Sequence, residues 1–197
     1  MANLFAIHSV GDSLITYLRN AYEVLEQSEK PDCTFTVLSS GQFGRADDDS
    51  TQISLYLYRV TMNEHIRNTQ PRHRPLSESI PLSLDLHYLL TVWANSASVE
   101  HFLLAWTMRE IFMRPTLNSS SLSDIANWGQ QDIIQLIPAE LSNEDLMRIW
   151  DTMEPAYHLS VSYIARVVRI DVDEGPDARP VVAQRFDFTD RVPEKMP

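Results

Sequence analysis

Apolar residues occupy every even position between residues 80 and 92: Ile80, Leu82, Leu84, Leu86, Tyr88, Leu90 and Val92. A period of two predicts a β-strand with one buried face. The odd positions become apolar only from Leu89 onward, so we expect the second half of this strand to be covered on both sides. A shift of one residue would turn the whole apolar set to the wrong face, and the register is therefore firmly specified.

The first part of the chain predicts one helix and two further strands. Apolar residues recur at helical spacing over residues 4–27, and Pro31 lies beyond the expected end of this helix. Strands are predicted at about 33–38 and 52–60. The long connection 61–79 has no clear periodicity, which indicates function or disorder at that length.

The second part predicts, in order, a helix from Ser98 to about Arg114, a helical turn at 121–127, a strand Ile133–Ile137, a helix Leu141–Met153 and a strand at 159–170. Ser142 is the expected N-cap of the last helix, with Asp145 at its third position and Leu141 and Leu146 as a hydrophobic staple. We expect a β-bulge or a doubly covered segment near 164–168.

This order predicts an α+β fold in which helices pack on one face of a mixed, mainly antiparallel sheet of about five strands. We assign residues 1–172 to one domain and 173–197 to a linker, a late strand and a tail. In the late strand Val182, Phe186 and Phe188 share one face. Such a strand either closes the sheet of its own domain or adds to the sheet edge of a neighbour, and the sequence leaves both readings open.

Composition and net charge reduce the number of function classes that fit this chain. The chain has 197 residues, 44% of them apolar, and a formal net charge of −11. This charge argues against a nucleic-acid or anionic-membrane binder, which needs a basic face. Among the basic residues only Lys30 and Lys195 are lysines, and an excess of arginine favours protein interfaces. The N-terminus lacks the pattern of a signal peptide, so we expect folding in the cytoplasm without membrane insertion.

The sequence offers little for catalysis, cofactors or metals. The six histidines lack ligand spacing, and the acidic run 47–49 lacks the pattern of a calcium loop. No Gly-x-Ser-x-Gly motif and no glycine-rich phosphate loop is present. Cys33 is the only cysteine and is interpreted as a small strand residue rather than a nucleophile. We therefore expect no enzyme and no bound cofactor or metal.

One basic cluster stands out in the long connection: Arg67, Arg72 and Arg74, with His65 and His73 beside them. In an acidic protein such a cluster suits electrostatic docking to an acidic partner surface. It is equally typical of a solvated loop, and both readings stay open.

Ile80–Ala94 resembles the cap, or tail-terminator, proteins of extracellular contractile injection systems of the antifeeding-prophage type. Three more segments agree, Ile53–Asn63, Leu141–Trp150 and Tyr157–Asp171, and the resemblance covers roughly residues 4–172. It implies a tail-terminator-like fold and a non-enzymatic homohexameric ring that closes the end of the inner tube and sheath and stops polymerisation. It also implies sheath and inner-tube proteins as partners, in a particle that is assembled in the cytoplasm and then released or membrane-anchored.

A small-molecule-binding or hydrolytic α+β domain is the alternative. That function requires an apolar pocket in which polar groups converge. A sequence cannot show such a pocket, so this alternative depends on the tertiary structure.

Overall fold

The computed structural model describes residues 2–26, 30–42, 50–63, 81–153 and 156–171. Its elements follow in the order α1 (Ala6–Glu23), β1 (Thr34–Leu38), β2 (Gln52–Met62), β3 (Leu82–Trp93), α3 (Ala97–Met113), β4 (Thr116–Asn118), the 3₁₀ turn η2 (Asp124–Ala126), β5 (Ile133–Ala139), α4 (Asn143–Asp151) and β6 (Ser160–Ile170). The helices and strands predicted within these residues are all present within a few residues of their expected bounds, whereas the late strand at Pro180–Phe188 lies outside the described residues. The sequence missed only β4, because three residues are too few to show an alternation.

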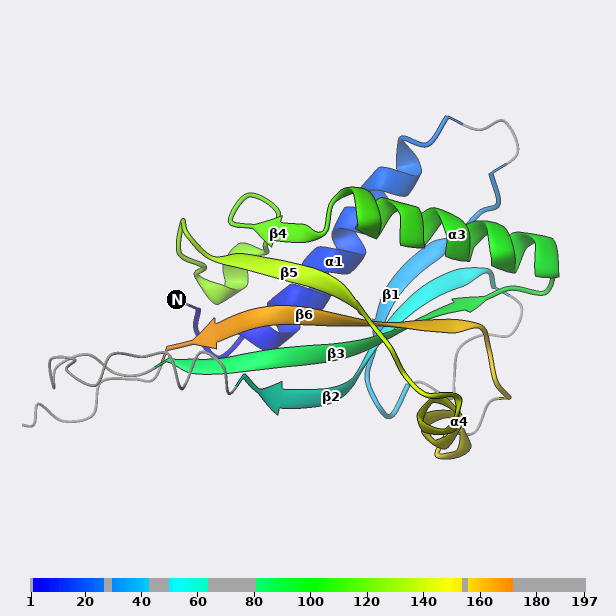
Figure 1. The fold of residues 1–197 in the computed structure, drawn as a ribbon. Coiled ribbons are helices and arrows are strands. Elements are labelled where there is room, and N and C mark those ends of the chain that lie inside the picture. Colours follow the sequence, from blue (N-terminus) through cyan, green and yellow to red (C-terminus); the bar gives the residue numbers. More distant parts are fainter. Residues whose placement is uncertain (1, 27–29, 43–49, 64–80, 154–155, 172–197) are drawn as a thin grey trace, which may run out of the picture.

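The strands form one curled sheet with the order β1-β2-β3-β6-β5-β4 (Figure 1). Strand β1 runs parallel to β2, and every other pair of neighbours is antiparallel. The predicted α+β class with a mixed, mainly antiparallel sheet is confirmed, with six strands where about five were expected.

Strand β3 lies at the centre of this sheet and pairs with β2 on one side and β6 on the other. Its even positions are buried from Leu84 to Val92, as the alternation predicted. At the start of the strand, Leu82 is 38% exposed because it lies at the end of the sheet. The face assignment from sequence is therefore correct over the part of β3 that is covered.

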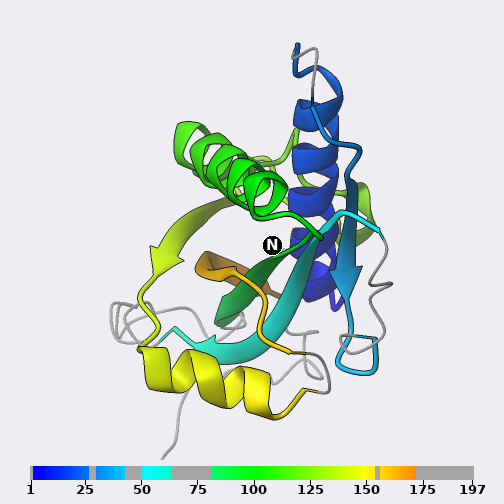
Figure 2. The ribbon, with the colours of Figure 1, turned by 90° about the vertical axis from the view of Figure 1, so that its right-hand side faces the viewer.

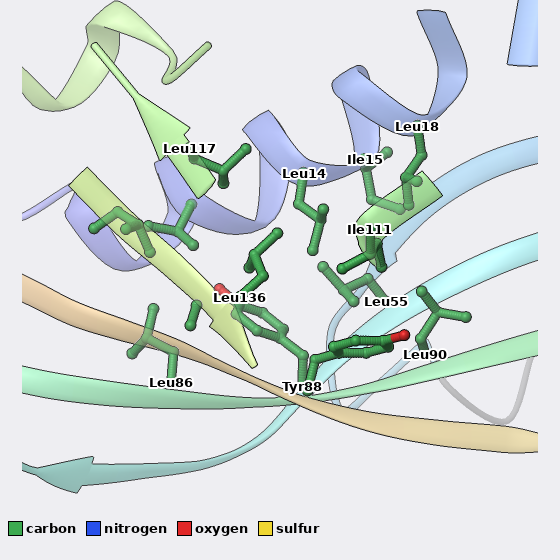
Figure 3. Packing of buried hydrophobic residues seen from close by; sticks show 14 of the residues in the cluster. Leu14, Ile15, Leu18, Leu55, Leu86, Tyr88, Leu90, Ile111, Leu117 and Leu136 are labelled. Carbon is green, nitrogen blue, oxygen red and sulfur yellow. The ribbon is translucent and has the colours of Figure 1, made fainter. Parts of the chain in front are cut away.

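Helices α1 and α3 cover the face of the sheet that carries these even positions (Figure 1). Leu14 and Leu18 of α1 point toward Tyr88 and Leu90 of β3 and form the main core with them (Figure 3). Gly11 of α1 lies in the same region, and an added Cβ there would make only an ordinary van der Waals contact of 3.4 Å with the Tyr88 hydroxyl oxygen.

Helix α4 lies on the opposite face of the sheet (Figure 2). Its Trp150 packs against Leu89 and Trp93, two odd positions of β3, in a second buried cluster. The expectation that helices pack on one face is thus correct for α1 and α3 and does not extend to α4. The expected double coverage of the second half of β3 is confirmed. The predicted cap of α4 is also present, because the Ser142 hydroxyl oxygen accepts from the Asp145 N–H at 3.0 Å.

Two β-bulges adjust the register of the sheet. On β6, Arg166 and Val167 lie opposite the single residue Asp85, which confirms the bulge predicted near 164–168. On β2, Tyr58 is an extra residue between Leu57 and Arg59. Because of this second bulge, the side chains that follow Tyr58 change faces relative to a regular alternation.

Candidate functional site

The structure offers two candidate interaction surfaces, a groove beneath α3 and an open edge of β2. The six docking residues proposed from sequence, Arg67, Arg72, Arg74, Val182, Phe186 and Phe188, lie outside the described residues. Their roles remain predictions. The candidate site is therefore built from the parts of the chain that the structure describes.

The groove lies between α3 and the strands β5 and β6. It consists of two adjoining cavities of about 410 and 450 Å³, which share Met108, Pro138 and Tyr163 in their walls. Helix α3 forms one wall, and β5, which pairs with β6, runs from beside α3 toward α4 (Figure 2). The second cavity reaches α4, where Leu146 lines it. The groove thus runs from the C-terminal part of α3 to α4.

The rim of the groove is apolar and exposed. Phe112 is 83% exposed and Met108 is 42% exposed, both on α3. Large apolar side chains that face solvent in this way are typical of surfaces that contact another protein. The charged residues in the two walls are Arg109 and Glu140.

The serine hydroxyls that line the groove form hydrogen bonds to side chains of other strands of the sheet. The Ser160 hydroxyl lies 2.9 Å from the Thr91 hydroxyl, and the Ser162 hydroxyl lies 3.0 Å from the Tyr58 hydroxyl. Burial raises the pKa of Tyr163, so its hydroxyl is neutral at physiological pH. The walls contain no pairing of a nucleophile with a base, and this is not the convergent polar site that a hydrolytic domain requires.

A polar contact between α1 and α3 holds α3 in position above the groove. The Tyr17 hydroxyl donates to Glu110 Oε1 at 2.5 Å, and the Arg114 guanidinium lies 5.8 Å from the centre of the Tyr17 ring. Burial, together with the Glu110 carboxylate, raises the pKa of Tyr17 to about 12. The tyrosine therefore remains a neutral donor throughout the physiological range.

The second surface is the outer edge of β2. Strand β1 pairs with β2 only from Gln52 to Tyr56, whereas β2 continues to Met62. Among the described residues, no strand pairs with the outer edge of the last part of β2. Two apolar side chains, Val60 and Met62, are exposed along it by 42% and 64%.

Within the described residues, no group of three or more histidine, cysteine or acidic side chains could hold a metal ion. His87 instead contacts Thr61, with 3.0 Å between Nε2 and Oγ1. Burial and the nearby Arg59 lower the pKa of His87, which favours the neutral ring. No helix in the described part of the chain is long and apolar enough to cross a membrane.

Sequence reasoning overlooked both surfaces. The sequence did contain a sign of the groove. Large apolar residues lie around the whole circumference of α3, more than one buried face can cover, so some of them must be exposed. The signal for the edge was weaker. Val60 and Met62 break the alternation of β2, and only the Tyr58 bulge explains where their side chains lie.

Comparisons with known proteins agree with the fold. The structure is similar to the sheath/tube terminator of the PVC extracellular contractile injection system in its extended state, with a TM-score of 0.57 and 16% identity over 96% of this chain and 65% of that chain. It is also similar to the tube-terminating cap of the anti-feeding prophage, with a TM-score of 0.51 and 16% identity over 92% of this chain and 59% of that chain. The chain thus spans about three fifths of the length of these proteins. No curated protein sequence matches it.

A family comparison extends over most of the sequence. The profile of the Pvc16 N-terminal domain matches residues 9–184, which include every described helix and strand except the start of α1. This confirms the kind of family inferred from the sequence. The chain belongs to the Pvc16 N-terminal domain family.

Proposed function

We propose that this protein is the structural cap of a contractile injection system, a ring that closes the end of the inner tube and sheath and stops their polymerisation. The observation that carries the proposal is that the fold, over 96% of the chain, is that of a protein which terminates a sheath and tube. Membership of the Pvc16 N-terminal domain family supports it. Such a role needs no catalysis, and the groove beneath α3 offers none.

The proposed partners are further copies of the chain in a homohexamer, together with sheath and inner-tube proteins. A closed ring presents identical surfaces to a symmetric lattice, and each subunit uses the same heterologous contact. The groove beneath α3 supports a docking role, because Met108 and Phe112 expose apolar surface beside an open cavity. We assign the cap function to residues 1–172, with assembly in the cytoplasm followed by incorporation into a released or anchored particle.

A deletion strain tests the function. Without the protein, electron microscopy should show tubes or sheaths of abnormal length or with open ends, while baseplates still form. Complementation with the wild-type gene should restore normal ends. Normal particle lengths and closed ends in the deletion strain would show that the protein is not the terminator.

Complementation with two variants then tests the groove. Phe112→Ser removes an 83% exposed apolar side chain from the groove, and Val24→Ser removes a 77% exposed one at the C-terminal end of α1. Surface changes of this kind alter stability by about 0.5 kcal/mol or less. We expect Phe112→Ser to leave ends open and Val24→Ser to restore them. Equal behaviour of the two variants would remove the groove from the docking surface.

A further inference from the structure

The outer edge of β2 has the geometry of an acceptor for an added strand. Asn63 donates its N–H to the Ser83 carbonyl at 2.9 Å across the β2–β3 ladder. Opposite residues of an antiparallel ladder alternate between bonded and non-bonded pairs. The backbone N–H and C=O groups of Met62 and Val60 therefore point away from β3, toward the outer edge of the sheet.

The side chains of this edge are apolar on one face. Val60 lies opposite Leu86 and Met62 opposite Leu84, so both face the side of the sheet that carries α1 and α3. The Tyr58 bulge puts them there. These two residues are 42% and 64% exposed, and no strand among the described residues pairs with the outer side of β2 at their positions.

We propose that this edge binds the C-terminal segment Pro180–Phe188 of a neighbouring copy of the chain, which adds to β2 as a further strand. The inference rests on the proposed ring. In this mode of recognition the main-chain hydrogen bonds provide affinity and the alternate side chains provide specificity. The alternation of the segment meets that need, since Val182, Phe186 and Phe188 share one face and can continue the apolar face of Val60 and Met62.

The opposite face of the segment carries Arg185 and Asp187, so its charges favour a register in which Asp187 rather than Arg185 lies beside Arg59. Arg59 precedes Val60 on β2 and is exposed on the other side of the sheet, where it lies opposite His87. When Phe186 and Phe188 face the apolar side, Asp187 between them falls on the side of Arg59. Opposite charges on neighbouring strands stabilise a pairing and fix its register.

The segment has the reach for this contact. Its linker, residues 172–179, leaves from the end of β6, where Ile170 pairs with Leu82 and Ala2 forms a bridge. Eight extended residues span about 26 Å, whereas β6 and β2 of the same chain are two strand spacings, about 10 Å, apart, so the linker is long enough to carry the segment past its own sheet. The donor segment and the acceptor edge are different surfaces of one chain, and repetition of such a heterologous contact can close a ring.

Cysteine cross-linking between two copies tests the proposal. Both copies carry Cys33→Ser, which removes the only native thiol. One copy then carries Met62→Cys, and the other carries Phe186→Cys and a larger affinity tag. After co-expression, a short thiol cross-linker should give the tagged–untagged heterodimer as the main product. Val24→Cys in place of Met62→Cys is the control, since it places an exposed thiol away from the edge.

Two results would overturn the proposal. One is a heterodimer yield no higher than that of the Val24→Cys control. The other is a chain with both cysteines that cross-links only within itself, because the segment would then close its own sheet. The experiment also separates failure of the strand contact from failure of the proposed ring. Closed rings that give no cross-linked heterodimer would refute the strand contact alone. Cross-linked heterodimers that form no closed ring would refute the ring alone.

A pair of triple variants gives an independent readout of assembly. Changing Val182, Phe186 and Phe188 to serine should abolish rings in size-exclusion chromatography without shifting the melting temperature of the domain. Changing Ala183, Arg185 and Thr189 to serine alters the other face without removing Asp187 and should retain the rings. Rings of equal stability in both variants would contradict the proposed strand addition.

Discussion

Substitution of Leu86 is the most direct test of how the central strand is packed. Leu86 is fully buried, between Val60 on β2 and Ala165 on β6. Leu86→Ala removes buried methyl groups and leaves a cavity, which costs about 2–5 kcal/mol in protein cores. Leu86→Asp loses the same methyl groups and in addition buries an unpaired carboxylate, which costs several kcal/mol. Together the two costs are comparable to the whole stability of a domain, about 5–15 kcal/mol. We expect Leu86→Ala to fold with reduced stability and Leu86→Asp to fail to fold.

Its neighbour Asp85 provides the matched control. Asp85 is half-buried on the opposite face, and both of its carboxylate oxygens lie 3.0 Å from the Asn63 amide nitrogen that donates to them. Asp85→Asn keeps one acceptor oxygen and the shape of the side chain. Its cost should therefore be about 1 kcal/mol or less, the net contribution of one hydrogen bond.

Urea unfolding followed by tryptophan fluorescence measures both effects, because Trp106 lies in the main core and Trp150 in the second cluster. The expected order of stability is wild type, Asp85→Asn, Leu86→Ala, with soluble Leu86→Asp absent. Equal losses for Asp85→Asn and Leu86→Ala would refute the face assignment. So would a loss below about 1 kcal/mol for Leu86→Ala, since a buried leucine costs more than that.

Three further outcomes are expected. Ser142→Ala removes the N-cap of α4 and should lower the free energy of unfolding by about 0.5–2 kcal/mol, whereas Ser142→Asp should retain most of it; equal losses would contradict the capping role. Burial raises the pKa of the Cys33 thiol to about 12, so at pH 8 a thiol-reactive dye should label it far more slowly than free cysteine and faster as pH rises; labelling at the free-cysteine rate would contradict this. Neutralising Arg67, Arg72 and Arg74 together should slow docking on the tube–sheath end and flatten its salt dependence in light-scattering assays, and an unchanged rate at low salt would return this segment to the solvated-loop reading.

The sequence by itself determined the elements and their faces. The alternation around Leu86 defined the central strand, and the Ser142 cap fixed the start of α4. Such signals are local, because a side-chain period or a cap depends on residues a few positions apart. They were sufficient for the α+β class and for the family. The metal-free, non-enzymatic expectation also came from sequence, and it stays part of the proposal.

Only the tertiary structure decided which surfaces remain open. The sequence did not reveal that β1 pairs with β2 in parallel and stops at Tyr56, or that the Tyr58 bulge turns Val60 and Met62 to the apolar face. Nor did it show that an open groove separates α3 from β5 and that Phe112 is exposed at its rim. These features depend on pairing between segments far apart in the chain. A local sequence pattern shows which side chains are apolar and share a face, whereas the pairing of distant segments determines which of these side chains remain exposed.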